Sequence, residues 1–135
     1  MSATHQQKHE AGRHLVVAEA LLRGYDAHTV GRSGLVDVNG HRAEVHVKTK
    51  GAWQIANLDR FAEGSTGRVV FVDLSGTVPE FFILNGEQAR AMVRRDFEQW
   101  LAGVGGRRPR TPGSKHTAFG VDRVQRWRNR WSLFD

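Results

Sequence analysis

The sequence predicts an α+β layered domain in which a mixed sheet of about five strands is flanked by helices. Three observations support this fold class. The segments run helix, three strands, connection, two strands and helix; glycine-containing turns separate the strands; and two long segments place apolar residues at helical spacing. With 135 residues the chain can bury one sizeable core, so we expect a single domain over residues 1–135.

The first half of the chain predicts a helix followed by three strands. Ala11, Leu15, Ala18 and Leu22 recur at helical spacing, and Gly24 is a typical residue just after a helix. The expected elements are a helix over 7–23, strands over 25–30, 35–38 and 42–50, and turns over 31–34 and 39–41.

The second half predicts a hairpin, a second helix and a basic tail. Residues 51–67 form a mixed connection in which a short helix would fit, and strands follow over 68–74 and 79–84. Asn85 is a good N-cap for a helix over 86–103. We expect that helix to bury Ala89, Met92, Val93, Phe97, Trp100 and Leu101. A basic loop over 105–116 should follow, and then a C-terminal helix over 121–134 with Val124, Trp127 and Trp131 on one side.

Composition excludes several kinds of site and favours an anionic partner. The chain has no cysteine, which excludes disulfides, thiolate zinc sites and cysteine nucleophiles. No apolar run suits a membrane span or a secretory signal, so we expect a soluble cytoplasmic protein without a membrane partner. Lys and Arg number 20 against 14 Asp and Glu, and the resulting net charge of +6 favours nucleic acid as the partner.

The segment RAEVHVKTK carries the residues of greatest chemical interest. Successive side chains of a strand point to opposite faces, so Glu44, His46 and Lys48 share one face. An acid, an imidazole and a lysine in one row could hold a metal ion and a phosphate. The simpler alternative is a solvated strand face, with Glu44 in a surface ion pair and His46 as a structural hydrogen-bond partner. Asp73, at the end of an apolar strand, is expected to cap the turn that follows it.

Four segments carry a resemblance to a known superfamily: GRHLVVAEALLRGYDAHTV, LVDVNG, VHVKTK and VVFVDL. In this order they resemble the PD-(D/E)xK nucleases, the fold of many restriction enzymes and junction resolvases. The similarity is greatest to small members with a GE-x-x-VA-x-x-L-x-x-x-GY helix and a Q/E-V-K-T strand. It covers roughly residues 12–84. It implies a restriction-endonuclease-like fold and a metal-dependent endonuclease that binds DNA and hydrolyses phosphodiester bonds.

The resemblance also implies roles for individual residues. Asp37 is the first catalytic acid, although a gap-free comparison places Ser33 there, and Lys48 is the lysine that contacts the phosphate or orients the attacking water. The implied cofactor is Mg²⁺ or Mn²⁺. The chain departs from the family pattern at His46, where the family has Glu, Asp or Gln, and at Arg13, where the similar small members have Glu. Imidazole is a poor ligand for Mg²⁺.

The hairpin turn decides which of these residues meet. If residues 40–41 form the turn, Asp37 lies opposite Glu44, and the two carboxylates with the neighbouring histidine could hold a metal ion. If residues 39–40 form it, Asp37 pairs with Arg42 and a salt bridge is expected instead. The metal ligands predicted in the first case are Asp37, Glu44 and His46.

Two functions compete on this reasoning. The first is a divergent metal-dependent endonuclease, which the retained Asp37 and Lys48 favour. The second is a degenerate nuclease-fold protein that binds nucleic acid or a protein partner without cutting, which the altered acids favour. An unrelated fold with a solvated strand face is the third option, DNA and RNA are both open as partners, and a homodimer is one possible assembly. The residues predicted to follow the nucleic-acid backbone are Lys50, Arg107, Arg108, Arg110 and Lys115.

Overall fold

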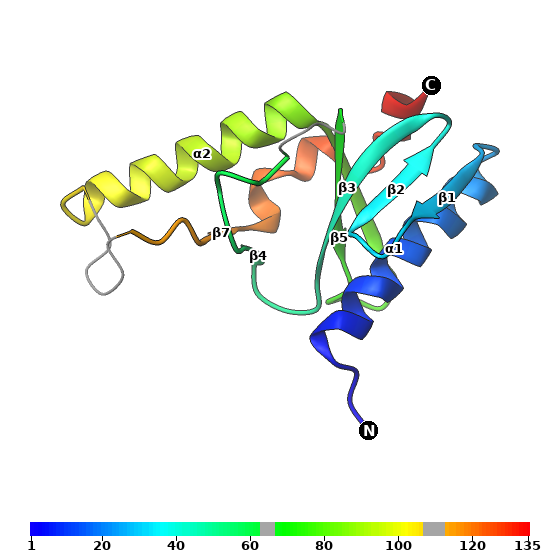
Figure 1. The fold of residues 1–135 in the computed structure, drawn as a ribbon, viewed down its shortest axis with the longest axis horizontal. Coiled ribbons are helices and arrows are strands. Elements are labelled where there is room, and N and C mark those ends of the chain that lie inside the picture. The colour runs from blue at the N-terminus through cyan, green and yellow to red at the C-terminus, as the bar shows by residue number, and fades with distance from the viewer. Residues whose placement is uncertain (63–66, 107–112) are drawn as a thin grey trace.

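The computed structural model of the chain describes residues 1–62, 67–106 and 113–135. Its elements are α1 (His5–Leu22), β1 (Ala27–Val30), β2 (Leu35–Val38), β3 (His41–Lys48), β4 (Trp53–Ile55), β5 (Arg68–Asp73), β6 (Glu80–Asn85), α2 (Gly86–Gly103), β7 (Thr117–Phe119), and three 3₁₀ helices, η1 (Val121–Arg123), η2 (Gln125–Trp127) and η3 (Trp131–Phe134). The main sheet is mixed and has the order β1-β2-β3-β5-β6, while β4 and β7 pair separately (Figure 1). The predicted α+β fold with a five-stranded mixed sheet is confirmed.

The first part of the chain forms α1 and an antiparallel meander. Thr4 caps α1 in a capping box with Gln7, in which each side chain accepts a hydrogen bond from the other residue's backbone N–H. The β2–β3 turn consists of Asn39 and Gly40, with φ of 53° and 81°. Two positive φ values are typical of the type I′ hairpin turn, which Asn-Gly favours.

A parallel crossover joins β3 to β5, and β6 then returns antiparallel to β5. The crossover contains the short strand β4, and no helix is formed in its described residues, 51–62 and 67, where a short helix would also have fitted. Strand β5 lies between β3 and β6, and its side chains from Val69 to Asp73 are buried on both faces. Val70 and Val72 face α1, whereas Val69 and Phe71 face the crossover and α2.

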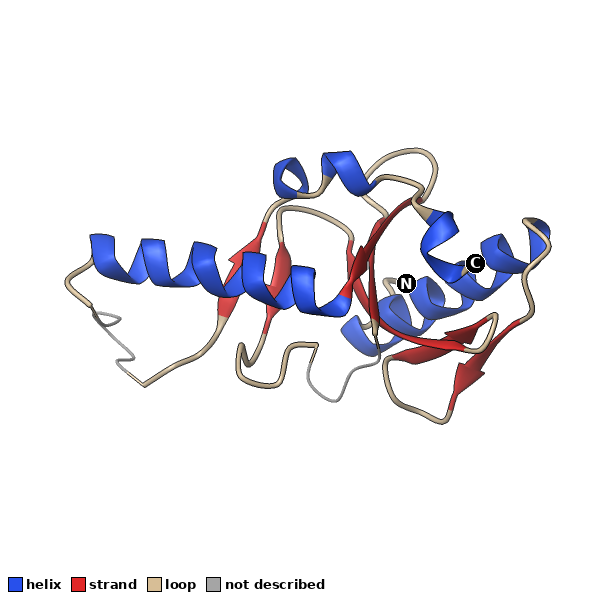
Figure 2. Ribbon diagram, turned by 90° about the horizontal axis from the view of Figure 1, so that it is seen from above, coloured by secondary structure: helices blue, strands red, loops and turns tan. Residues whose placement is uncertain are grey.

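The sheet therefore separates two apolar layers. The layer that includes α1 consists of Val16, Ala20, Val36, Val38, Ala43, Val45, Val70, Val72, Phe81, Ile83, Trp131 and Phe134. The layer that includes α2 and the crossover contains Trp53, Ile55, Leu58, Phe61, Val69, Phe71, Phe82, Leu84, Ala89, Val93, Phe97, Phe119 and Val124. Beyond its contact with β5, β6 and β7, α2 runs away from the main sheet, as Figure 2 shows from above.

The expected buried face of α1 was wrong. Ala11, Ala18 and Leu22 are exposed, and the helix buries Gly12, Arg13, Val16 and Ala20 instead. The reason is that α1 approaches the sheet closely at Gly12, and that Arg13 is buried with partners of its own. On α2, Ala89, Val93 and Phe97 are buried as expected, but Trp100 is 47% exposed.

The C-terminal residues form short 3₁₀ helices, so the single helix predicted over 121–134 was wrong. Val124 and Trp131 are buried, and Trp127 is half-buried. This segment closes over the N-terminal half: the Tyr25 hydroxyl donates to the Trp131 carbonyl at 3.1 Å, and the Asn39 amide donates to the Phe134 carbonyl at 2.7 Å. In the described parts of the chain, neither helix is long and apolar enough to cross a membrane.

Candidate functional site

The row on β3 lies on the face of the sheet that the crossover covers. Strand β2 begins at Leu35 opposite Glu44, so β3 continues past the start of β2 and is paired there only with β5. Among the described residues, the half of β3 that carries His46 and Lys48 therefore has no paired strand on the side of β2. This register places the end of β3 beside the first turns of α1 (Figure 1).

Glu44 and His46 form a pair within the row. The His46 Nε2 lies 2.7 Å from the Glu44 Oε1, and each side chain is 19% exposed. The Ala62 N–H also donates to the same carboxylate oxygen, at 3.3 Å. The imidazole packs beside Phe61 and Phe71, with ring centroids 5.1 and 5.7 Å apart. His46 is thus a structural hydrogen-bond partner in this arrangement.

Lys48 is buried and paired with an acid on the neighbouring strand. Its Nζ donates to the Asp73 Oδ1 at 3.0 Å and lies 5.3 Å from the centre of the Trp53 ring. The same oxygen accepts from the N–H and hydroxyl of Ser75, which confirms the expected turn cap. Burial alone would raise the pKa of Asp73, but these hydrogen bonds and the nearby ammonium outweigh it and hold the pKa below its ordinary value.

The residues predicted to bind a metal ion are not arranged for one. The turn is residues 39–40, so Asp37 lies opposite Arg42 and not opposite Glu44. The Asp37 carboxylate accepts from the Gly40 N–H at 3.1 Å, and the salt bridge expected with Arg42 is not formed. Within residues 1–62, 67–106 and 113–135, no three Asp, Glu or His side chains converge on a common point suitable for a metal. These donors do not fit a Mg²⁺ or Mn²⁺ site as they stand.

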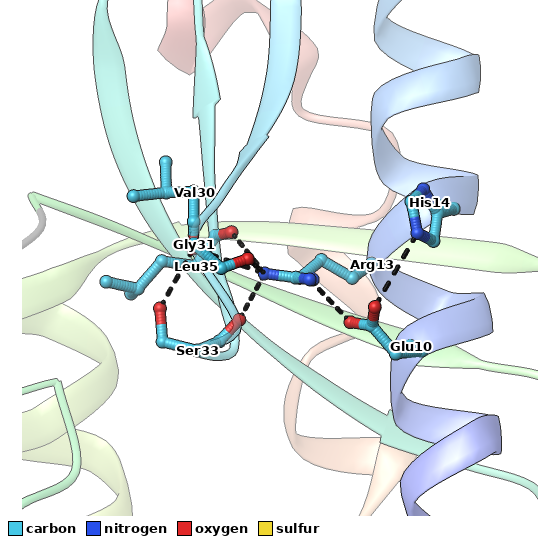
Figure 3. A network of polar contacts seen from close by, with 7 residues as sticks. All are labelled: Glu10, Arg13, His14, Val30, Gly31, Ser33 and Leu35. Atoms are coloured by element: carbon cyan, nitrogen blue, oxygen red, sulfur yellow. Dashed lines mark hydrogen bonds and ion pairs between the residues drawn. The ribbon is translucent and has the colours of Figure 1, made fainter.

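Arg13 holds the loop between β1 and β2 against α1. Its Nη1 donates to the carbonyl oxygens of Gly31 at 3.0 Å and Val30 at 3.2 Å, also contacts those of Ser33 and Leu35, and its Nη2 lies 2.6 Å from Glu10 (Figure 3). Its side chain is 3% exposed. The helix position where the resemblance expects an acid therefore carries a structural cation.

A pocket of about 310 Å³ lies between the start of α1 and the β3–β4 connection. Helix α1 contributes His5, Lys8 and His9, and the end of β3 and the connection contribute His46, Val47, Lys48, Thr49, Lys50, Ala52, Trp53 and Gln54. Among the described residues that line it, none is acidic. Burial lowers the pKa of His9, and the neighbouring His46, His5 and Arg13 lower it further against the opposing effect of Glu10.

The contribution of α1 to this pocket was missed in the sequence. His5, Lys8 and His9 share one side of the first turns, and that turn contains no acid. Basic groups are unfavourable at a helix N-terminus, since the macrodipole is positive there. The basic and imidazole-rich first turn is the signal that could have indicated the contribution of α1 to this pocket.

The residues predicted to contact nucleic acid have different placements. Lys50 is exposed and lines the pocket. Lys115 is exposed, and its carbonyl accepts from the Leu58 N–H at 2.9 Å. Arg107, Arg108 and Arg110 lie outside the described residues.

Comparisons with protein-family models, curated proteins and solved structures found no match to this chain.

Proposed function

We propose that this protein binds the phosphate backbone of nucleic acid, with DNA as the expected form, on a restriction-endonuclease-like scaffold, and that it does so without cutting. The observation that carries the proposal is the basic pocket at the end of β3. Lys8, Lys48 and Lys50 line it together with three histidines, and its described lining has no carboxylate. The net charge of +6 supports the same kind of partner.

The charges of two pocket lysines are available to a ligand. No described carboxylate lies within ion-pair distance of Lys8 or Lys50. Lysines that neutralise phosphates release counterions, and this release makes binding depend on salt.

We favour binding over cleavage because the side chains expected to act in catalysis are hydrogen-bonded or ion-paired to other groups of the protein. Glu44 bonds to His46, Asp37 caps its own turn, and Lys48 is neutralised by Asp73. A cutting enzyme of the resembled class would have to release these groups to bind Mg²⁺ and to activate water. Metal-dependent hydrolysis is accordingly the alternative that the experiment must test.

The test measures binding of labelled duplex and single-stranded DNA, and of RNA, by fluorescence anisotropy between about 50 and 200 mM salt. We expect Lys8→Ala/Lys50→Ala to weaken duplex binding and to reduce the slope of log affinity against log salt by about 1.8, which is about 0.9 for each lost phosphate contact. The matched control is Arg42→Ala/Arg95→Ala, which removes two exposed charges outside the pocket.

The same preparations are incubated with DNA and Mg²⁺, Mn²⁺ or a chelator. Intact DNA in every arm is the expected result. Nicking that requires a divalent cation and disappears in Lys48→Met would establish the enzyme and overturn the non-cutting part of the proposal. Equal losses in the pocket variant and its control would overturn the assignment of the pocket.

A further inference from the structure

The pocket at the end of β3 includes His46 and Lys48, two residues that the resemblance places at the active site, but its donors differ in character from those of a divalent-cation site. Divalent cations such as Mg²⁺ take oxygen ligands, chiefly carboxylates. The described lining has three lysines and three imidazoles and no acid. The neighbouring carboxylates of Glu44, Asp73 and Glu10 are engaged with His46, Lys48 and Arg13 respectively.

Side chains of the first turns of α1 supply hydrogen-bond donors to the pocket. The Gln7 N–H of the first turn of α1 already donates to the Thr4 hydroxyl at 3.1 Å. His5, Lys8 and His9 project from the same turns into the pocket. Lysine offers three N–H donors, and a protonated imidazole offers two.

Lys48 contributes an ammonium group with a fixed position, which is already paired with Asp73. It lines the pocket while Asp73 and the Trp53 ring hold its ammonium in place. Lys50, two residues further along the chain, is exposed and can adjust to a ligand. An exposed lysine beside this fixed ammonium suits a compact anion with several oxygens.

His9 is a pocket imidazole whose protonation an anion would favour. It is half-buried, and its ring lies 6.1 Å from that of His5. Burial and the adjacent basic groups keep its pKa low in the free protein. An anion beside it would offset both effects and favour uptake of a proton. The titratable and charged groups around His9 are His5, Lys8, Glu10 and Arg13 on α1, His46, Lys48 and Lys50 at the end of β3, and Arg32 in the β1–β2 loop.

We infer that this pocket binds a phosphate group directly, through His5, Lys8, His9 and Lys50 with Lys48 behind them, and without a bridging metal ion. The inference rests on the proposed function, in which the phosphate belongs to a nucleic-acid backbone. A phosphate monoester or free phosphate presents the same oxygens and is the other source of this ligand.

The test follows the imidazole resonances of His5, His9 and His46 by NMR while inorganic phosphate, a mononucleotide or duplex DNA is added at constant ionic strength. We expect saturable shifts of His5 and His9 with phosphate in the presence of a chelator. Lys8→Ala should weaken phosphate binding about tenfold, the usual consequence of losing one charge-assisted hydrogen bond. Arg95→Ala, whose side chain is exposed on α2, serves as the control and should bind phosphate like the wild type.

The outcomes separate the two proposals. Saturable phosphate binding without DNA binding would support the pocket as a small-phosphate site and overturn the nucleic-acid function. DNA binding that Lys8→Ala leaves unchanged, with no phosphate-induced shifts, would overturn the pocket assignment alone. Shifts that Mg²⁺ produces and phosphate does not would overturn the direct anion site in favour of a cation site.

Discussion

Lys48 and Asp73 lie opposite each other on the parallel strands β3 and β5, and their side chains meet in a buried ion pair at 3.0 Å. The side chains are 6% and 9% exposed. The resemblance assigns the Lys48 ammonium to catalysis, but here it pairs with Asp73 on β5, the strand that follows the crossover from β3. Its first role is to neutralise a buried carboxylate, and the consequences for stability can be measured.

Removal of one partner should be costly. We expect Lys48→Met to lower the free energy of unfolding by about 3 kcal/mol, because it leaves the Asp73 charge buried without its cation. Urea denaturation measures the loss, and Lys50→Met, at an exposed position, should change stability by less than about 0.5 kcal/mol. The double variant Lys48→Met/Asp73→Asn should recover part of the loss. Equal stabilities of the two single variants would contradict a structural role for the pair.

The lowered pKa of Asp73 predicts that the protein loses part of its stability at acidic pH. Its pKa in the folded protein is lower than in the unfolded chain, so the unfolded state binds a proton first as pH falls. The stabilisation is complete above the unfolded pKa of about 3.9 and is lost as pH falls through the folded pKa. Urea unfolding at a series of acidic pH values should show this loss in the wild type and a smaller one in Asp73→Asn. Parallel curves for the two proteins would exclude the assignment to Asp73.

His9 predicts a second effect of pH, closer to neutrality. Its folded pKa is lowered from 6.5, so below that pH the unfolded chain takes up a proton that the folded protein does not. Stability should therefore fall as pH decreases from about 7 through this window, and His9→Gln should flatten the dependence. His28→Gln, at an exposed position of β1, is the control and should leave the wild-type dependence in place. Added phosphate should reduce the fall if the anion occupies the pocket.

Arg13 should be essential for the β1–β2 loop. Arg13→Ala removes the buried guanidinium that donates to the carbonyl oxygens of Val30, Gly31, Ser33 and Leu35, and we expect a loss of about 2–4 kcal/mol in the free energy of unfolding. Arg13→Lys keeps the charge but reaches fewer of the oxygens, so its loss should be intermediate. Hydrogen exchange of the loop amides should accelerate in both variants. Wild-type stability of Arg13→Ala would show that water replaces the guanidinium without cost.

Gly12 marks a close approach of α1 to β3. A Cβ at this position would lie 2.2 Å from the Val47 Cγ2, so Gly12→Ala should destabilise by about 1–3 kcal/mol despite the better helix propensity of alanine. Val47→Ala removes the obstructing methyl groups, and the double variant should be more stable than the sum of the single effects implies. Gly103→Ala, which meets no atom within 4 Å at the end of α2, is the control and should be neutral or stabilising. Additive single effects would contradict the steric explanation.

Local sequence signals predicted the five strands of the main sheet, the burial of Ala89, Val93 and Phe97 on α2, and the cap at Asp73, because each depends on neighbouring residues. The Asn39-Gly40 turn was one of two alternatives that the sequence left open, and the choice changed the partner of Asp37. The Lys48–Asp73 pair was not predictable, since it joins residues 25 positions apart through the register of a parallel crossover.

The same limit applied to the helices and the small sheet. The predicted buried face of α1 was wrong because the buried Arg13 and the close-packed Gly12, and not the apolar periodicity, determine which face of the helix meets the sheet. Strands β4 and β7 are three residues each, and the β4–β7 pairing joins distant parts of the chain. Short strands carry too little pattern to indicate such a partner.

The closure of the C-terminal segment over α1 and β2 bears on how the chain acquires its structure during synthesis. Trp131 and Phe134 complete the apolar layer beneath α1, and Phe134 accepts from Asn39, 95 positions earlier. The N-terminal meander is therefore synthesised before the residues that cover it. Until the C-terminal segment has been synthesised, one apolar face of the meander stays exposed. Long-range contacts of this kind slow folding and leave intermediates open to aggregation. On the ribosome, the nascent chain should resist proteolysis only after residue 134 has emerged.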